Sequence, residues 1–139
     1  KNPLGGTFIY PGVKETLVEL KKIYKNLVIC TQKNEKPARF ILKHFNILEY
    51  FSGFAFGDTL NVLKPDPRMV QHAIKNFNPE RVLYVGDSLT DAKTAKNSNS
   101  TFILFTEGYR QTPIEELEPD YYFSNFSNLP TIIEAIQKI

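Results

Sequence analysis

The stretch RVLYVGDSLTDAKTAKNS, residues 81–98, decides the fold. Its first five residues, Arg81–Val85, form a short run rich in apolar and β-branched side chains, which predicts a buried strand. Gly86 and Asp87 end this strand, and a short helix is predicted near residues 91–97. A strand that passes through a polar turn into a helix is typical of α/β proteins with a parallel sheet.

The same alternation of strand and helix extends in both directions from this stretch. Helices are predicted at residues 12–25, 35–45 and about 69–77, with strands at 27–30 and 54–56. Beyond residue 98, strands are predicted at 101–105 and 121–123, and a closing helix at 129–139. The pattern predicts one domain over residues 1–139, with an α/β fold in which helices cover both faces of a three-layer, Rossmann-like parallel sheet.

Composition narrows the class of protein but not its chemistry. The chain has 139 residues, a hydrophobic fraction of 42% and a charged fraction of 23%, as expected of a soluble globular domain. Its net charge of +2 gives no reason to expect a nucleic-acid partner. It has neither an apolar run of ~20 residues nor a secretory signal, so no membrane partner is expected. The single cysteine, Cys30, fits a reducing compartment, and we expect a cytoplasmic protein.

Polar residues follow three of the predicted strands. Thr31 and Gln32 follow the strand at 27–30, Lys64 follows the strand at 54–56 by a loop, and Asp87 and Asp91 follow the strand at 81–85. Ligands of open α/β sheets bind outside the carboxyl ends of the strands, and these ends share one edge of the sheet. We therefore expect a hydroxyl, an ammonium group and two carboxylates to meet there.

Such a set suits a phosphate monoester held together with a divalent cation. The hydroxyl of Thr31 and nearby backbone N–H groups can donate to phosphate oxygens, and Lys64 can neutralise their charge. Asp87 and Asp91 offer the hard oxygen ligands that Mg²⁺ prefers. Phosphoryl transfer depends on such positioning and charge stabilisation, so a small phosphorylated substrate is expected.

Three segments that contain these residues resemble the second, third and fourth motifs of the haloacid dehalogenase superfamily: VICTQK, KPDP and VLYVGDSLTDAKTAKNS. The segment YPGVKETLVELKK is similar to the one that joins cap and core in phosphoglycolate-phosphatase-like members. The resemblance implies a Mg²⁺-dependent phosphatase that forms an aspartyl-phosphate. It implies that Thr31 and Lys64 bind the phosphoryl group, that Asp87 ligates Mg²⁺ and that Asp91 supports the metal directly or through water.

The chain departs from this family at the first motif, an aspartate-rich strand end that carries the nucleophile and the general acid. The nearest string is Pro3-Leu4-Gly5-Gly6-Thr7, which has no aspartate. Either the chain is a fragment without its first strand and cap, or it is a non-catalytic relative; retention of the other motifs favours the fragment. The missing strand is central in the family, between the strands ending at Thr31 and Asp87. We therefore expect upstream residues to fill that gap, and this chain alone to be inactive.

Three other interpretations stay open. A non-catalytic phosphate- or metal-binding protein with the same fold is the main competitor. The string Gly86-Asp87-Ser88-Leu89 matches the motif of GDSL-type esterases, but neither His44 nor His72 follows the serine, so the base would come in an unusual order. Ser88 and Asp91 also have the spacing of a helix-capping pair, which is a purely structural role.

Overall fold

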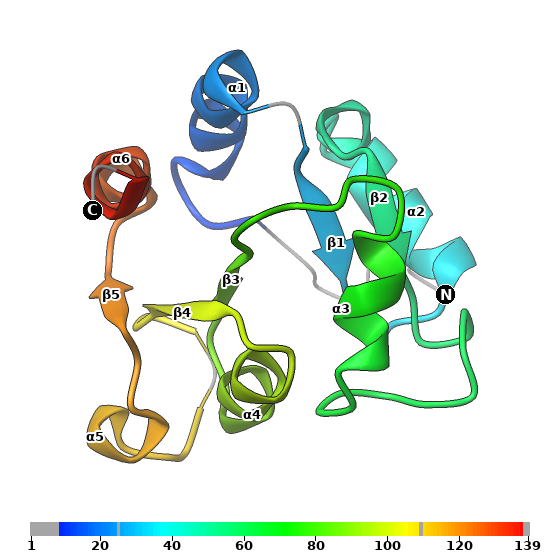
Figure 1. Cartoon of the computed structure of the whole chain (residues 1–139). Helices are drawn as coiled ribbons and strands as arrows, with labels where there is room; N and C mark the ends of the chain where they lie inside the picture. The colour runs from blue at the N-terminus through cyan, green and yellow to red at the C-terminus, as the bar shows by residue number, and fades with distance from the viewer. Residues whose placement is uncertain (1–8, 25, 109, 138–139) are drawn as a thin grey trace.

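The computed structural model describes residues 9–24, 26–108 and 110–137. Helices and strands alternate along these ranges (Figure 1). In chain order the elements are α1 (Val13–Ile23), β1 (Val28–Cys30), α2 (Glu35–His44), η1 (Leu48–Tyr50), β2 (Gly53–Ala55), α3 (Arg68–Ala73), β3 (Leu83–Gly86), α4 (Leu89–Asn97), β4 (Thr101–Phe105), α5 (Ile114–Leu117), β5 (Tyr121–Phe123), η2 (Phe126–Asn128) and α6 (Leu129–Gln137).

All strand pairs in the described part of the chain are parallel, which confirms the predicted α/β class. They form two sheets, one with β1 beside β2 and one in the order β3-β4-β5. In the first, Cys30 pairs with Ala55, and in the second, Gly86 pairs with Leu104. Among the described residues, the free edges of β1 and β3 have no strand partner. The sheet is therefore split between the two strands where the sequence predicts a missing one.

A cavity of about 480 Å³ lies between the two sheets. Val28 and Ile29 of β1 and Leu83 and Val85 of β3 line it, together with residues of α1 and α6. Val85 is 39% exposed, although its neighbours along β3 are more buried. Apolar side chains on facing strand edges are the surroundings that an additional buried strand requires.

Helices cover both faces of the larger sheet, as its strand pattern requires. Successive residues of a strand point to opposite faces, and β4 buries both. Ile103 and Phe105 pack into a core formed with α1, β5 and α6. Phe102 and Leu104 pack into a second core with residues of α3, β3, α4 and α5. The layers predicted from the sequence are therefore present, with the core on either side of β4.

Some element boundaries differ from the sequence predictions for local reasons. β3 begins at Leu83 instead of Arg81, because its ladder starts opposite Thr101, the first residue of β4. The third helix ends at Ala73, short of the predicted 77. The four-residue helix α5 and the two 3-10 helices have too few turns for an apolar period, so they were not predicted.

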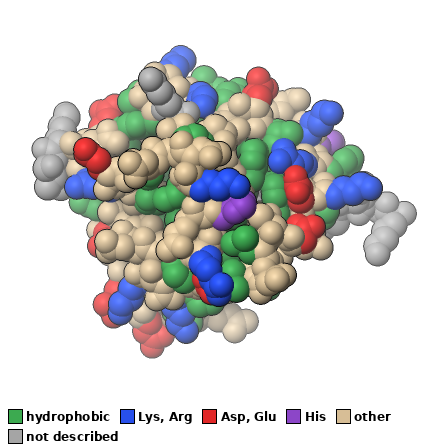
Figure 2. All heavy atoms as spheres, turned by 45° about the vertical axis from the view of Figure 1, so that its right-hand side comes forward, with side chains coloured by type: hydrophobic (Ala, Val, Ile, Leu, Met, Phe, Trp, Pro, Cys, Tyr) green, Lys and Arg blue, Asp and Glu red, His purple; other side chains and the backbone are tan. Residues whose placement is uncertain are grey.

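The surface carries both signs of charge. On the face drawn in Figure 2, Lys and Arg side chains are interspersed with Asp and Glu.

Within the described ranges, the helices are too short or too polar to span a membrane. Residues 3–7, the string nearest to the first family motif, lie outside the described ranges.

Candidate functional site

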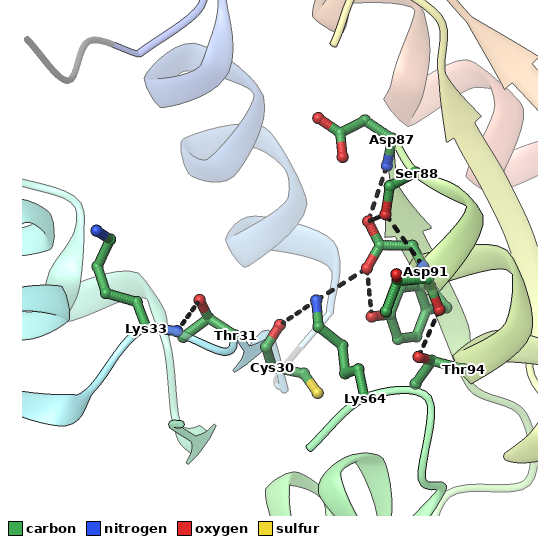
Figure 3. Close-up of polar contacts among 10 residues, drawn as sticks. Cys30, Thr31, Lys33, Lys64, Asp87, Ser88, Asp91 and Thr94 are labelled. Atoms are coloured by element: carbon green, nitrogen blue, oxygen red, sulfur yellow. Dashed lines mark hydrogen bonds and ion pairs between the residues drawn. The ribbon is translucent and has the colours of Figure 1, made fainter. Parts of the chain in front are cut away.

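The predicted site residues gather at the carboxyl ends of β1 and β3. Thr31 directly follows β1, Lys64 lies on the loop before α3, and Asp87 follows β3 (Figure 3). Asp91 lies in the first turn of α4. The Lys64 Nζ atom is 2.9 Å from Asp91 Oδ1 and 3.5 Å from the carbonyl oxygen of Cys30, which precedes Thr31. Lys64 thus links the ends of β1 and β3.

Asp91 is the centre of the hydrogen-bond network. Its Oδ1 atom accepts from Lys64 Nζ at 2.9 Å and from the Tyr84 hydroxyl at 2.7 Å. Its Oδ2 atom accepts from the Asp87 backbone N–H at 3.0 Å and from the Ser88 hydroxyl at 3.1 Å. Both oxygens of this buried carboxylate are therefore engaged within the protein.

The Lys64–Asp91 ion pair is shielded from water. The two side chains are 13% and 10% exposed. Burial acts to raise the pKa of Asp91, but the charge of Lys64 and the hydrogen bonds from Lys64, Tyr84 and the Asp87 amide outweigh it and lower that pKa below its usual range. The carboxylate is consequently ionised at neutral pH and serves as a fixed counter-charge for Lys64.

Asp87 presents the more open carboxylate. Its backbone N–H donates to Asp91 Oδ2, and its side chain lies against Gly108 in the loop after β4, where a Cβ atom would clash with Asp87 Oδ2. Burial, and then the nearby charge of Asp91, raise the pKa of the Asp87 carboxyl above its usual value. Ionising the Asp87 carboxyl is therefore unfavourable when no cation is near it. A bound cation would stabilise the ionised form and so favour the carboxylate.

Thr31 keeps a hydroxyl proton to donate at the end of β1. Its Oγ1 atom accepts a hydrogen bond from the backbone N–H of Lys33 at 3.1 Å, and its own N–H donates to Ala55 O at 3.0 Å. These contacts fix the side chain in the turn that leads into α2. Gln32 is exposed beside it. Cys30 is partly buried, and burial is the main cause that raises the pKa of its thiol.

Ser88 has the structural role that its spacing to Asp91 predicts. It is the N-cap of α4: its hydroxyl accepts from the Asp91 N–H at 3.1 Å and donates to Asp91 Oδ2. The two histidines make their contacts elsewhere, His72 with Lys75 and His44 with the rings of Phe40 and Phe45. Neither histidine is placed as the base that an esterase serine needs.

Two residues of the site were missed by sequence reasoning. Tyr84 lies within the strand predicted at residues 81–85, where no role in the site was predicted for it, and Gly108 lies beyond the strand predicted at 101–105. The signal for Tyr84 was a hydroxyl in the middle of an apolar strand, where a buried polar group needs a partner. Gly108 had no local signal, because its closeness to Asp87 depends on the pairing of β3 with β4.

The oxygen atoms at this site are of the type that binds Mg²⁺, but the described residues supply too few of them to fill its coordination sphere. Carboxylate and hydroxyl oxygens are the ligands that this ion prefers. Among the described residues, however, no group of three or more His, Cys, Asp or Glu side chains is arranged to hold a metal. Asp87 provides one available carboxylate, so the other ligands must come from water, substrate or further protein residues.

Comparison of the sequence with known proteins identifies relatives of this chain. The family model of haloacid dehalogenase-like hydrolases matches residues 4–99. The chain is 40% identical to a phosphoglycolate phosphatase of Rhodobacter capsulatus over 130 residues, which are 94% of this chain and 59% of that protein. A phosphoglycolate phosphatase of Pasteurella multocida is 35% identical over 91% of this chain and 58% of its own length.

Solved structures show the same similarity. A predicted phosphoglycolate phosphatase from Haemophilus somnus 129PT superposes with a TM-score of 0.88 at 32% identity, over 95% of this chain and 60% of that one. A phosphatase of the same superfamily from Thermococcus onnurineus gives a TM-score of 0.77 at 29% identity, over 90% and 58% of the two chains. The chain thus spans about 60% of the length of these relatives.

Proposed function

Because the chain belongs to the haloacid dehalogenase-like hydrolases, we propose that it forms most of the catalytic core of a Mg²⁺-dependent phosphomonoesterase. Its substrate is a small phosphorylated metabolite of the phosphoglycolate type, since phosphoglycolate phosphatases are 35–40% identical over nearly all of the chain. The observation that carries the proposal is the convergence of Thr31, Lys64 and Asp87 on one edge of the sheet. A single thiol and the absence of a membrane-spanning helix in the described ranges are compatible with a cytoplasmic enzyme.

The phosphate group would be bound between the ends of β1 and β3. The Thr31 hydroxyl and the N–H groups around Gln32 donate to its oxygens, and the Lys64 ammonium neutralises them. Lys64 is suited to this because Asp91 and the Cys30 carbonyl oxygen fix its position, while the third N–H of the ammonium group can point toward a ligand. These residues therefore orient the phosphoryl group and stabilise the charge that builds up during its transfer.

Asp87 would ligate Mg²⁺ directly. Asp91 is the second residue assigned to the metal, and its four hydrogen bonds favour a supporting role, through the Asp87 backbone and through water. When bound, the metal polarises the phosphoryl group and offsets its negative charge. The chain would hold the Asp87 carboxylate beside the phosphate, because the Asp87 side chain packs against Gly108.

The nucleophile and the general acid would come from a strand inserted between β1 and β3. Three observations support this: the edges of these strands that have no strand partner among the described residues, the apolar cavity between them, and the roughly 40% of the relatives' length that this chain does not match. A strand there would end between Thr31 and Asp87 and so direct its carboxylates at the phosphate. Residues 1–139 alone are then expected to be inactive.

The test is hydrolysis of phosphoglycolate and of an aryl phosphate by the intact protein with Mg²⁺. Asp87→Asn should weaken Mg²⁺ binding and lower kcat by about 100-fold or more, because it removes a charged ligand. Glu115→Gln, which removes an exposed carboxylate on α5, is the control and should leave both unchanged. Full activity of Asp87→Asn would refute its role. No turnover by a folded, Mg²⁺-binding wild type would favour the non-catalytic binding protein.

A further inference from the structure

A phenol hydroxyl lies beneath the Lys64–Asp91 ion pair. Tyr84 is the second residue of β3 and is 8% exposed. Its hydroxyl donates to Asp91 Oδ1 at 2.7 Å, and this is the same oxygen that accepts from Lys64 Nζ at 2.9 Å. One carboxylate oxygen is therefore held by a donor from the sheet and a donor from the loop before α3.

The hydroxyl is not needed for packing. The Tyr84 ring lies in the core between β3, β4 and α4, with its centroid 6.3 Å from that of Phe102. A phenylalanine at this position would fill the same apolar volume. Burying a hydroxyl instead costs free energy unless it is hydrogen-bonded, and here the Asp91 carboxylate is a bonding partner.

We propose that Tyr84 is a positioning residue, whose hydroxyl fixes the orientation of the Asp91 carboxylate and thereby the place of the Lys64 ammonium at the end of β1. The other two donors to Asp91, the Asp87 N–H and the Ser88 hydroxyl, are close in sequence and hold Oδ2. Tyr84 is the donor that ties Oδ1 to the rigid core. Without it, Oδ1 is held by the flexible Lys64 side chain alone, so the carboxylate plane can tilt about the Cβ–Cγ bond and Lys64 can shift with it.

The consequence for catalysis rests on the proposed function. An ammonium displaced from its place still attracts a phosphate, but it no longer matches the charge that develops during phosphoryl transfer. Because Thr31 and the backbone N–H groups also bind the ground state, Tyr84→Phe should lower kcat about tenfold and change KM by less than about threefold.

The experiment compares Tyr84→Phe with wild type in the intact protein. Tyr122→Phe is the matched control, because it removes a phenol hydroxyl from a residue that is 66% exposed. In an Asp91→Asn background, the effect of Tyr84→Phe on kcat should disappear, since the partner of the hydroxyl has changed. A kcat within twofold of wild type, or an equal loss in both backgrounds, overturns the proposal.

A second measurement does not depend on turnover. The ¹H–¹⁵N correlation of the Lys64 ammonium should shift in Tyr84→Phe and stay in place in Tyr122→Phe; an unmoved resonance overturns the proposal. If Tyr84→Phe does not fold, replacement of Tyr84 by 3-fluorotyrosine keeps the ring and strengthens the donor, and the same resonance decides. If the wild type does not hydrolyse phosphate esters, the proposed function fails while this resonance still tests Tyr84.

Discussion

Replacing Asp91 and replacing Lys64 should lower the free energy of unfolding by different amounts, although the two residues form one ion pair. Asp91→Asn leaves the buried ammonium with the Cys30 carbonyl oxygen at 3.5 Å as its other hydrogen-bond partner. It also places an NH₂ group where an oxygen had accepted two hydrogen bonds. Breaking a buried pair in this way costs about 3–5 kcal/mol, so we expect a loss of about 4 kcal/mol in the free energy of unfolding.

Lys64→Met should cost less, because three donors remain on the Asp91 carboxylate. The Tyr84 hydroxyl, the Asp87 N–H and the Ser88 hydroxyl continue to satisfy it, and methionine keeps most of the apolar stem of lysine. Loss of one hydrogen bond to a charged group is worth about 2 kcal/mol. In the double variant no buried ammonium is left without its partner. Its loss in the free energy of unfolding should therefore be about 2 kcal/mol smaller than the sum of the two single losses.

The assay is urea unfolding of the intact protein at pH 7, followed by circular dichroism, for the wild type, both single variants and the double variant. Glu35→Gln is the control: it breaks the exposed Glu35–Arg39 pair, whose side chains are 50% and 42% exposed, and should cost less than about 0.5 kcal/mol. A larger loss for Lys64→Met than for Asp91→Asn, or a coupling below about 0.5 kcal/mol, would refute the reasoning.

Three further results are expected. Gly108→Ala should weaken Mg²⁺ binding about tenfold by calorimetry, because a Cβ atom there would clash with Asp87 Oδ2 and push the carboxylate aside; unchanged affinity would mean that the loop yields instead. Ser88→Ala should cost about 1 kcal/mol of stability through the lost N-cap while kcat for an aryl phosphate stays within a few-fold, and abolished hydrolysis would contradict the structural role of Ser88. Acid should also weaken the contribution of Asp91 to stability. Its pKa is lowered on folding, so the unfolded state binds the extra proton and the stabilisation is full above the ordinary aspartate pKa of about 3.9. Below that pH, the difference in unfolding free energy between wild type and Asp91→Asn should shrink, and a constant difference would contradict the shift.

The class of the fold and the edge that carries the site were predictable because both follow from local patterns. Residues 81–98 encode a strand, a polar turn and a helix, and the structure has β3 and α4 there. Chain order alone then places Thr31, Lys64 and Asp87 at the carboxyl ends of parallel strands. The type of each side chain was sufficient to suggest phosphate and a metal as ligands.

What the sequence could not show are contacts made between elements that are distant in the chain. The loop before α3 and the first turn of α4 are separated by a helix and a strand, so no spacing rule predicts that Lys64 pairs with Asp91. The share of Asp91 in metal binding was open for the same reason. Its four hydrogen-bond donors come from three parts of the chain, and only their positions show that both oxygens are engaged.

The site also joins the two sheets. Lys64 belongs to the part of the chain that packs on β1 and β2, while Asp91 and Tyr84 belong to the part around β3 and β4. Beside the ion pair, Asn97 of α4 donates to the Pro65 carbonyl oxygen at 2.9 Å, and Val70 of α3 packs into the core of the larger sheet. These contacts hold β1 and β3 at a fixed spacing, although the described residues place no strand between them. A strand inserted there would therefore meet the groups that we propose to bind phosphate and metal already held in place, so substitutions that weaken the Lys64–Asp91 pair should also lower the proposed phosphatase activity.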